Sequence, residues 1–242
     1  MERSEKLGLV IPTLNEAGNI AAVLHRARAS LDSLGVNYDI TVVDDDSRDG
    51  TEQVVQEIAA QDSRIKLLVR KGARGLAGAV IYGWQHTDAD LLGVMDADLQ
   101  HPPELLPELF KAMQHGYDVA VASRYIAEDG ITRGWNPVRR LVSLLGTWVT
   151  VPLQKHNIRV KDPLSGFFIV RRNCIGGIPL HSQGFKILLE ILVRGRVRTA
   201  AEIPFHFGLR QTGKSKASLK VALDYFSLLG RLSLDSLLKL GS

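Results

Sequence analysis

Residues 91–103 read LLGVMDADLQHPP, and this stretch predicts both the fold class and the place of a site. Its first four residues form a short apolar run of the length and bulk expected of a buried strand. Two carboxylates, Asp96 and Asp98, follow at once, and a Pro-Pro pair ends the stretch. In open α/β sheets ligands bind outside the carboxyl ends of the strands. We therefore expect both carboxylates at a ligand-binding edge.

Asp96 and Asp98 stand one residue apart, and they repel each other unless a positive charge lies between them. A divalent cation is the usual solution. Hard carboxylate oxygens suit Mg²⁺ or Mn²⁺, and such ions commonly hold substrate phosphates. Because Asp-x-Asp is a short pattern, the alternative is a solvated loop that contains two acids by chance.

Short apolar runs alternate with segments of helical periodicity along the first half of the chain. We predict helices at residues 15–34, 51–60, 76–86 and 103–116, and strands at residues 7–11, 38–43, 65–69, 91–95 and 117–122. Strands that alternate with helices of roughly 10–15 residues are typical of βαβ units. The sequence therefore predicts an α/β fold with a mostly parallel sheet flanked by helices.

The second half of the chain is less regular. Residues 136–153 and 185–193 are predicted helices, residues 160–170 a turn that runs into a strand, and residues 197–207 a strand. Residues 217–240 have the apolar spacing of an amphipathic helix. For that helix a membrane interface, the rest of the domain and a partner chain are all open as binding surfaces.

Three predicted strands are followed by polar residues, at 12–16, 44–47 and 96–100. In a parallel sheet these segments would lie side by side, and this convergence favours a real site over chance acids. The glycines at positions 72, 75 and 78 match no phosphate-binding loop, because Gly-Lys-Ser/Thr and Gly-x-Gly are absent there. We interpret them as loop and helix-packing glycines.

The charge of the chain is unevenly distributed. Residues 1–122 contain 11 Lys/Arg and 19 Asp/Glu, a net charge of −8, whereas residues 123–242 contain 19 and 7, a net charge of +12. An acidic half suits a metal, and a basic half suits phosphates or an anionic membrane surface. No helix-turn-helix, zinc-finger or RNP pattern occurs, so we expect no nucleic acid partner.

Basic residues follow several predicted elements of the second half. Arg124 comes after the strand at 117–122, where a guanidinium can bind a phosphate through two hydrogen bonds. Arg139 lies near the start of a predicted helix, whose N-terminal dipole would also favour an anion. The loop at 210–216 is basic and contains a glycine, as expected of a flap over phosphates. The alternative for each is a solvated surface residue.

Two further features of the sequence bear on the cellular compartment and on membrane insertion. Cys174 is the only cysteine, so no disulfide can form within the chain, which fits a reducing compartment. No run of 18 uncharged apolar residues occurs, so the sequence predicts no transmembrane helix.

Six motifs in order resemble one known family. They are IPTLNE at 11–16, VVDDDSRDGT at 42–51, MDADLQHP at 95–102, SRY at 123–125, DPLSGF at 162–167, and Arg210 with Lys216. Together they resemble the family 2 glycosyltransferases of GT-A (Rossmann-like) fold, most closely the dolichyl-phosphate (polyprenyl-phosphate) mannose synthases, over about residues 7–216. The resemblance implies an enzyme that moves mannose from GDP-mannose to a polyprenyl (dolichyl) phosphate and depends on Mg²⁺ or Mn²⁺.

The resemblance also implies roles for single residues at the donor site. The nucleoside would be held by Pro12, Glu16, Val43 and Asp45. The diphosphate would lie along Asp96, Ala97 and Asp98, and the donor's phosphates would be gripped by Arg124, Arg210 and Lys216.

The metal and acceptor sites follow from the same resemblance. Asp98 and Gln100 would bind the metal, and Arg139 and Ser143 would receive the acceptor's phosphate. The residues expected to act in catalysis are Asp98, Arg139 and Arg210.

The resemblance divides the chain into a catalytic domain at residues 1–216 and a C-terminal amphipathic helix at 217–242. Within the domain, residues 1–122 would be the nucleotide-binding half and 123–216 the acceptor half. The expected partners are a nucleotide-sugar donor, a polyprenyl phosphate, a membrane surface, and either a second copy or a membrane-anchoring subunit. The expected location is the cytoplasmic face of a membrane, as a peripheral protein.

Two departures from the family leave alternatives open. Leu14 stands where relatives often have an aromatic residue near the base, and many relatives have C-terminal transmembrane helices. An undecaprenyl-phosphate glucosyltransferase that uses UDP-glucose is one alternative, and a transferase to a sugar hydroxyl is another. A non-catalytic nucleotide-sugar-binding module is a third. A nucleotidyltransferase fits less well, because residues 7–16 lack a Gly-rich basic loop.

Overall fold

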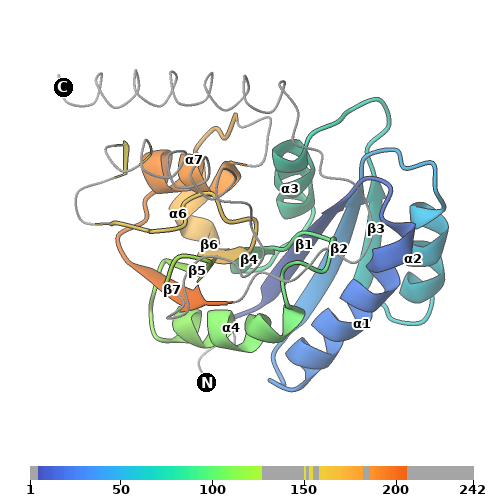
Figure 1. The fold of residues 1–242 in the computed structure, drawn as a ribbon, viewed down its shortest axis with the longest axis horizontal. Helices are drawn as coiled ribbons and strands as arrows, with labels where there is room; N and C mark the ends of the chain where they lie inside the picture. Colours follow the sequence, from blue (N-terminus) through green and yellow to red (C-terminus); the bar gives the residue numbers. More distant parts are fainter. Residues whose placement is uncertain (1–4, 127–149, 151–152, 155–157, 182–185, 206–242) are drawn as a thin grey trace, which may run out of the picture.

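The computed structural model describes residues 5–126, 150, 153–154, 158–181 and 186–205. In this part of the chain seven strands form one sheet in the order β3-β2-β1-β4-β6-β5-β7 (Figure 1). The strands are β1 (Leu7–Thr13), β2 (Tyr38–Asp44), β3 (Ile65–Val69), β4 (Leu91–Val94), β5 (Val119–Ser123), β6 (Phe168–Arg171) and β7 (Ala200–Pro204). The helices are α1 (Ala17–Asp32), α2 (Thr51–Ala59), α3 (Leu76–Gln85), the 3₁₀ turn η1 (Pro103–Leu105), α4 (Leu106–Gln114), α6 (Arg172–Ile175) and α7 (Ile187–Arg194).

The predicted mostly parallel sheet is confirmed. Strands β1 to β4 run parallel to one another, and β7 runs parallel to β5. The exception is β6, which lies between β4 and β5 and is antiparallel to both. Sequence periodicity did not predict this direction.

Helices cover both faces of the sheet (Figure 1). One core packs α1, α2 and α4 against the sheet, and a second packs α3 and α7 against its other face. Within β1, Leu9 and Ile11 belong to the first core and Val10 to the second, as the alternation of a strand requires. Because both faces are covered, β1 and β2 are buried along their whole length.

Most predicted elements occur within a few residues of their expected bounds. The predicted helix at 103–116 begins as a 3₁₀ turn, and α6 was not predicted. The predicted strand at 197–207 is shorter, and its Pro204 ends β7 at the edge of the sheet, where a missing N–H is tolerated. Most of the predicted helix at 136–153 and all of that at 217–240 lie outside the described residues. Among the helices that the structure describes, none is long and apolar enough to cross a membrane.

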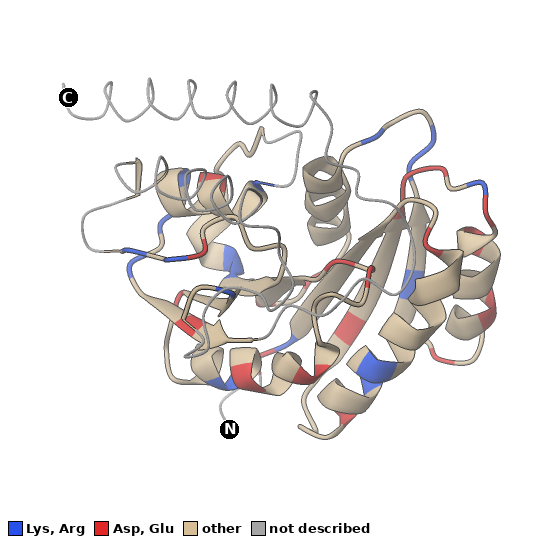
Figure 2. Ribbon diagram, viewed as in Figure 1, with Lys and Arg blue, Asp and Glu red and all other residues tan. Residues whose placement is uncertain are grey.

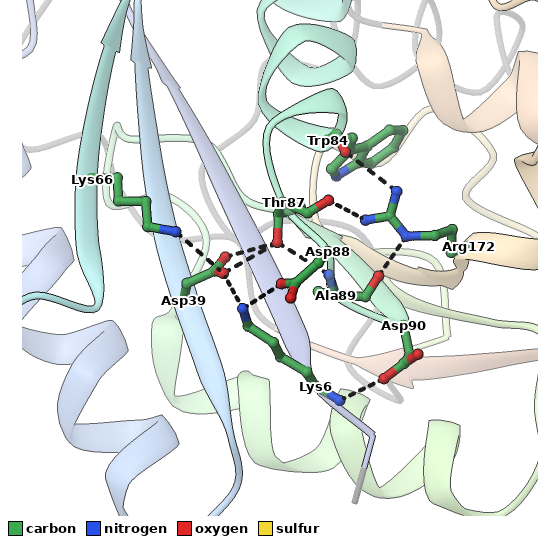
Figure 3. Close-up of polar contacts among 9 residues, drawn as sticks. All are labelled: Lys6, Asp39, Lys66, Trp84, Thr87, Asp88, Ala89, Asp90 and Arg172. Atoms are coloured by element: carbon green, nitrogen blue, oxygen red, sulfur yellow. Dashed lines mark hydrogen bonds and ion pairs between the residues drawn. The ribbon is translucent and has the colours of Figure 1, made fainter. Parts of the chain in front are cut away.

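A polar network joins three strands at the amino edge of the sheet (Figure 3). The Lys6 ammonium, just before β1, lies 2.8 Å from the buried Asp39 carboxylate on β2 and 2.6 Å from Asp88 before β4. Thr87 also donates its hydroxyl to Asp39, at 3.1 Å. These contacts fix the relative positions of β1, β2 and β4.

Arg172, the first residue of α6, joins the same network directly after β6 (Figure 3). Its guanidinium donates to the carbonyl oxygens of Ala89 at 2.5 Å, Thr87 at 2.9 Å and Trp84 at 3.4 Å. It therefore caps the end of α3 and holds the start of β4. Because β1, β2 and β4 run parallel, their carboxyl ends lie together at the opposite edge of the sheet.

Candidate active site

Acidic residues occupy the loops that follow β2 and β4 (Figure 2). Asp44, the last residue of β2, is fully buried. Its carboxylate accepts the hydroxyls of Thr13 and Ser47, each at 2.7 Å, and the Ser47 backbone N–H at 2.7 Å. Asp44 therefore joins the ends of β1 and β2 and acts as a structural residue.

The segment after β1 is held against the segment after β2. Asn15 has a positive φ of 56°, its N–H donates to the Ser47 hydroxyl at 2.7 Å, and its side-chain oxygen accepts the Arg48 N–H at 2.9 Å. The Asp49 carboxylate accepts the N–H of Ala17 at the start of α1. The predicted adjacency of residues 12–16 and 44–47 is therefore confirmed.

The residues predicted to hold a nucleoside lie on these two segments. Pro12 and Val43 are register partners in the β1–β2 ladder, and both are buried. Glu16 is half-buried, and its N–H donates to the Thr51 hydroxyl at 2.9 Å. The structure thus brings the predicted nucleoside residues together, and their binding role stays a prediction.

Asp45 is a buried carboxylate with a defined set of donors. Arg70 Nε donates to it at 2.8 Å, the Gly75 N–H at 2.8 Å, and Arg70 Nη2 at 3.4 Å. Burial raises the pKa of Asp45 above its usual range, and the Gly75 N–H and Arg70 oppose that shift. The sequence did not predict Arg70, because nothing in the spacing joins positions 45 and 70.

The turn after β4 places Asp96 and Asp98 at the carboxyl edge, as predicted. Leu99 has a positive φ of 59°, and the Gln100 N–H donates to the Asp98 carboxylate at 3.2 Å. The Asp96 carboxylate packs on Gly166, where an added Cβ would lie 2.6 Å from Asp96 Oδ2. The acidic turn is therefore built against a second motif.

His101 anchors the end of this turn. Its ring is 4% exposed, lies 5.7 Å from the Phe167 ring and 5.5 Å from the Phe205 ring, and has Nδ1 3.5 Å from Asp96 Oδ2. Burial lowers the pKa of His101 to about 4, so the imidazole is neutral at pH 7. His101 was not among the predicted site residues.

The motif at 162–167 connects β5 to the acidic turn. The Ser165 hydroxyl donates to the Ala122 carbonyl at 2.8 Å, and the Ala122 N–H donates to the Phe167 carbonyl at 2.9 Å. Gly166 and Phe167 then contact Asp96 and His101, respectively. The two motifs thus form one packed unit.

Arg124, a predicted phosphate ligand, is paired within the chain. Its Nε and Nη2 each donate to the buried Asp162 carboxylate at 2.7 Å, and its N–H donates to Asp162 at 3.1 Å. The Asp162 N–H in turn donates to Glu202 on β7 at 3.1 Å. This geometry fixes the guanidinium at the end of β5, and its contact with donor phosphates stays a prediction.

Lys186 is a further cation of this region that sequence reasoning missed. It immediately precedes α7, and Asp96, Arg124 and Asp162 all act on it electrostatically. Burial, together with the Arg124 charge, lowers the pKa of Lys186 to about 8. No motif marks it, because only the fold brings position 186 to the acidic turn.

A metal at this edge would use oxygen ligands. The described residues contain no group of three His, Cys, Asp or Glu side chains placed to hold a metal ion. Asp98 and Gln100, joined through the Gln100 N–H, offer one carboxylate and one amide oxygen. That set fits Mg²⁺ or Mn²⁺, which commonly bind through one or two carboxylates with substrate phosphates and water.

Four predicted ligands lie outside the described residues: Arg139, Ser143, Arg210 and Lys216. A cavity of about 530 Å³ lies beside α3 and is lined by Arg70, Lys71, Tyr82 and His181, among others. None of the described residues predicted for the site lines it. The acidic turn, and not this cavity, is therefore the candidate active site.

Comparison with known proteins identifies relatives of this chain. Residues 9–175 match the family described as Glycosyl transferase family 2. The chain is 40% identical over 228 residues to a dolichol-phosphate mannosyltransferase of Pyrococcus furiosus, covering 94% of this chain and 63% of that protein's length. It is 34% identical to a protein of the same name from Saccharomyces cerevisiae, covering 95% of this chain and 87% of that protein.

The fold also has relatives among solved structures. A glucosyl-3-phosphoglycerate synthase from Mycobacterium tuberculosis, in complex with Mn²⁺, UDP-glucose and phosphoglyceric acid, superposes with a TM-score of 0.65 at 19% identity. The match covers 95% of this chain and 80% of that chain. At this identity the likeness bears on the fold alone.

Proposed function

Because the chain belongs to glycosyl transferase family 2, we propose that it is an inverting glycosyltransferase that moves mannose from GDP-mannose to a polyprenyl (dolichyl) phosphate with a divalent cation. The observation that carries the proposal is the convergence of four motifs at one edge of the sheet. The segments after β1, β2 and β4 meet there, and the motif at 162–167 supports the last of them. Two relatives named for dolichol-phosphate mannose transfer support the choice of sugar and acceptor.

In this proposal the donor lies along the carboxyl edge of the sheet. Pro12, Glu16, Val43 and Asp45 hold the nucleoside, and the diphosphate passes Asp96 and Ala97. Arg124 contributes positive charge from the end of β5, where Asp162 orients it. Arg210 and Lys216 would grip the same phosphates.

Asp98 and Gln100 would hold the cation. A divalent cation supplies charge stabilisation for the leaving nucleoside diphosphate as the sugar–oxygen bond breaks. The Gln100 N–H orients the Asp98 carboxylate for that purpose. Mg²⁺ and Mn²⁺ both suit these oxygens.

The acceptor site needs a positively charged side chain and no general base. A phosphate monoester has a second pKa of about 6, so it is largely ionised and nucleophilic at pH 7. Arg139 and Ser143 would hold that phosphate in line with the anomeric carbon, and direct displacement inverts the configuration there. The net charge of +12 on residues 123–242 fits an acceptor half that meets anionic lipid as a peripheral protein on a cytoplasmic membrane face.

Transfer of labelled sugar to a short polyprenyl phosphate tests the proposal. GDP-mannose and UDP-glucose are compared with Mg²⁺, with Mn²⁺ and with EDTA, and the product's anomeric configuration is read by NMR. Metal-dependent β-linked product from GDP-mannose alone is expected. Product from UDP-glucose alone would change the donor, an α-linked product would refute inversion, and nucleotide binding without turnover would favour a binding module.

A further inference from the structure

Arg70 follows directly after β3, and its side chain reaches across to the end of β2. Its backbone N–H donates to the Asp44 carbonyl at 2.8 Å, which extends the β2–β3 ladder by one residue. Its guanidinium then lies on Asp45, with Nε 2.8 Å from Oδ1 and Nη2 3.4 Å from Oδ2. The side chains of Arg70 and Asp45 are 11% and 6% exposed, so this ion pair is buried.

The loop from β3 to α3 is shaped around this pair. Gly75 has a φ of 133°, a conformation that other residues rarely adopt, and its N–H donates to Asp45 Oδ2 at 2.8 Å. At Gly78 an added Cβ would lie 2.6 Å from Arg70 Nη1. Gly75 in the loop and Gly78 in α3 are therefore glycines for different physical reasons, and both reasons involve the Arg70–Asp45 pair.

The pair leaves Asp45 able to accept one more hydrogen bond. An ionised carboxylate offers roughly four lone-pair positions. Within the described part of the chain, three N–H groups approach Asp45, two at Oδ2 and one at Oδ1. Oδ1 thus keeps one position for a ligand N–H or O–H group. Without Arg70 the buried charge would be uncompensated, and the carboxylate would take up a proton or turn away.

We infer that Arg70 is a positioning residue for nucleoside recognition: it keeps Asp45 ionised and oriented so that Oδ1 accepts one hydrogen bond from the donor's nucleoside. The inference rests on the proposed function, which assigns Asp45 to the nucleoside. Arg70 acts through Asp45 and has no contact with the substrate in this account.

Binding of GDP, UDP and inorganic pyrophosphate to the full chain in the presence of Mg²⁺, measured by calorimetry, tests the inference. The variants are Arg70→Met, Arg70→Lys, Asp45→Asn and the double variant Arg70→Met with Asp45→Asn. Arg64→Met is the matched control. Arg64 also pairs with a carboxylate, Asp62, at 2.7 Å, but it lies just before β3, at the opposite end of that strand from Arg70. Melting curves establish that each variant is folded.

For whichever nucleotide the wild type binds, Arg70→Met is expected to raise Kd about tenfold or more, as loss of a hydrogen-bonded charge implies. Arg70→Lys should weaken nucleotide binding less, because lysine keeps the positive charge although it lacks the planar guanidinium. The double variant should bind no more weakly than Asp45→Asn alone, and pyrophosphate affinity should not change, since the effect is on the nucleoside. Arg64→Met should bind as the wild type does.

An Arg70→Met variant that is folded and binds nucleotide within twofold of the wild type would overturn the inference and leave the proposed function intact. Additive losses in the double variant, or equal weakening of pyrophosphate, would also overturn it. A wild type that prefers UDP would change the proposed donor, and the same comparison would then be made with UDP. A wild type that binds neither nucleotide would refute both.

Discussion

Neighbouring carboxylates at the carboxyl edge of the sheet differ in what surrounds them. Asp44 accepts three hydrogen bonds from Thr13 and Ser47 and is fully buried. Asp45, the next residue, is paired with Arg70. Asp98 is partly exposed and accepts one N–H from its own turn. Of these three, only Asp98 has the exposure that a metal ion with its phosphate and water ligands requires.

We predict that Asp98→Asn lowers metal-dependent transfer on the order of 100-fold, because it removes the only charged metal ligand that we propose. The fold should be unaffected, since Asn has nearly the shape of Asp and its side-chain oxygen can still accept the Gln100 N–H. Turnover across a Mn²⁺ series and thermal melting measure the two effects. Asp88→Asn is the control, an exposed carboxylate at the opposite edge. Near-normal turnover in Asp98→Asn would refute the metal assignment.

A substitution at Gly166 tests whether the position of the Asp96 carboxylate matters for transfer. In Gly166→Ala the new Cβ would lie 2.6 Å from Asp96 Oδ2, so the carboxylate or the backbone has to move. We expect an overpacking cost of about 1–3 kcal/mol and a fall in transfer of about tenfold or more, because small misplacements in an active site slow the reaction.

Gly176→Ala is the matched control for that experiment. Its Cβ would lie 3.5 Å from the Arg172 carbonyl oxygen, which is an ordinary contact and the one found among the described residues. Both variants are compared by thermal melting and by transfer rate. Equal rates in the two variants would show that Asp96 tolerates displacement.

At the scale of elements, the local pattern predicts strands and helices but not their partners. β3 occurs at the predicted residues 65–69, because a compact apolar run ends at a turn on either side. The antiparallel direction of β6 was not predicted, since it depends on pairing with β4 and β5, which come from elsewhere in the chain. Arg70 and Lys186 were missed for the same reason, because only tertiary contacts bring them to the site. His101 lies within the motif at 95–102, but its packing on Phe167 and Phe205 is a tertiary contact that local sequence does not predict.

The turn before β3 predicts a pH dependence of stability. Arg64 donates through Nη2 to Asp62 at 2.7 Å, and this pairing lowers the pKa of Asp62 to about 2. A lowered carboxylate pKa means that the pairing stabilises the fold above the unfolded pKa of about 4, and that this stabilisation is lost as the pH falls from about 4 to 2. It amounts to at most about 2 kcal/mol, because solvent screens the exposed Arg64.

Asp62→Asn should therefore be less stable than the wild type at pH 7, and the difference should shrink toward zero as the pH approaches 2. Urea unfolding of both proteins at several pH values measures this. A difference in unfolding free energy that stays constant over the whole range would show that the carboxylate's charge is not what stabilises the turn.

For the molecule as a whole, the sheet interleaves the two halves of the sequence. β6, from the second half, lies between β4 and β5 from the first. Its neighbours in sequence, the motif at 162–167, hold Arg124 and support Asp96. The predicted acceptor half is thus structurally part of the candidate active site, and the division into two halves stays a prediction about function.

The charge asymmetry leads to a prediction for the whole chain. Residues 123–242 have a net charge of +12, and each Lys or Arg near an anionic lipid surface contributes about 1 kcal/mol of attraction within a Debye length. We therefore expect the protein to co-sediment with vesicles that contain anionic lipid, and the bound fraction to fall steeply between about 0.05 and about 0.5 M salt, where screening shortens that length. Neutral phosphatidylcholine vesicles are the control and should bind less, without that salt dependence. Equal binding to neutral and anionic vesicles would mean that apolar contacts, and not the basic half, bring the chain to a membrane.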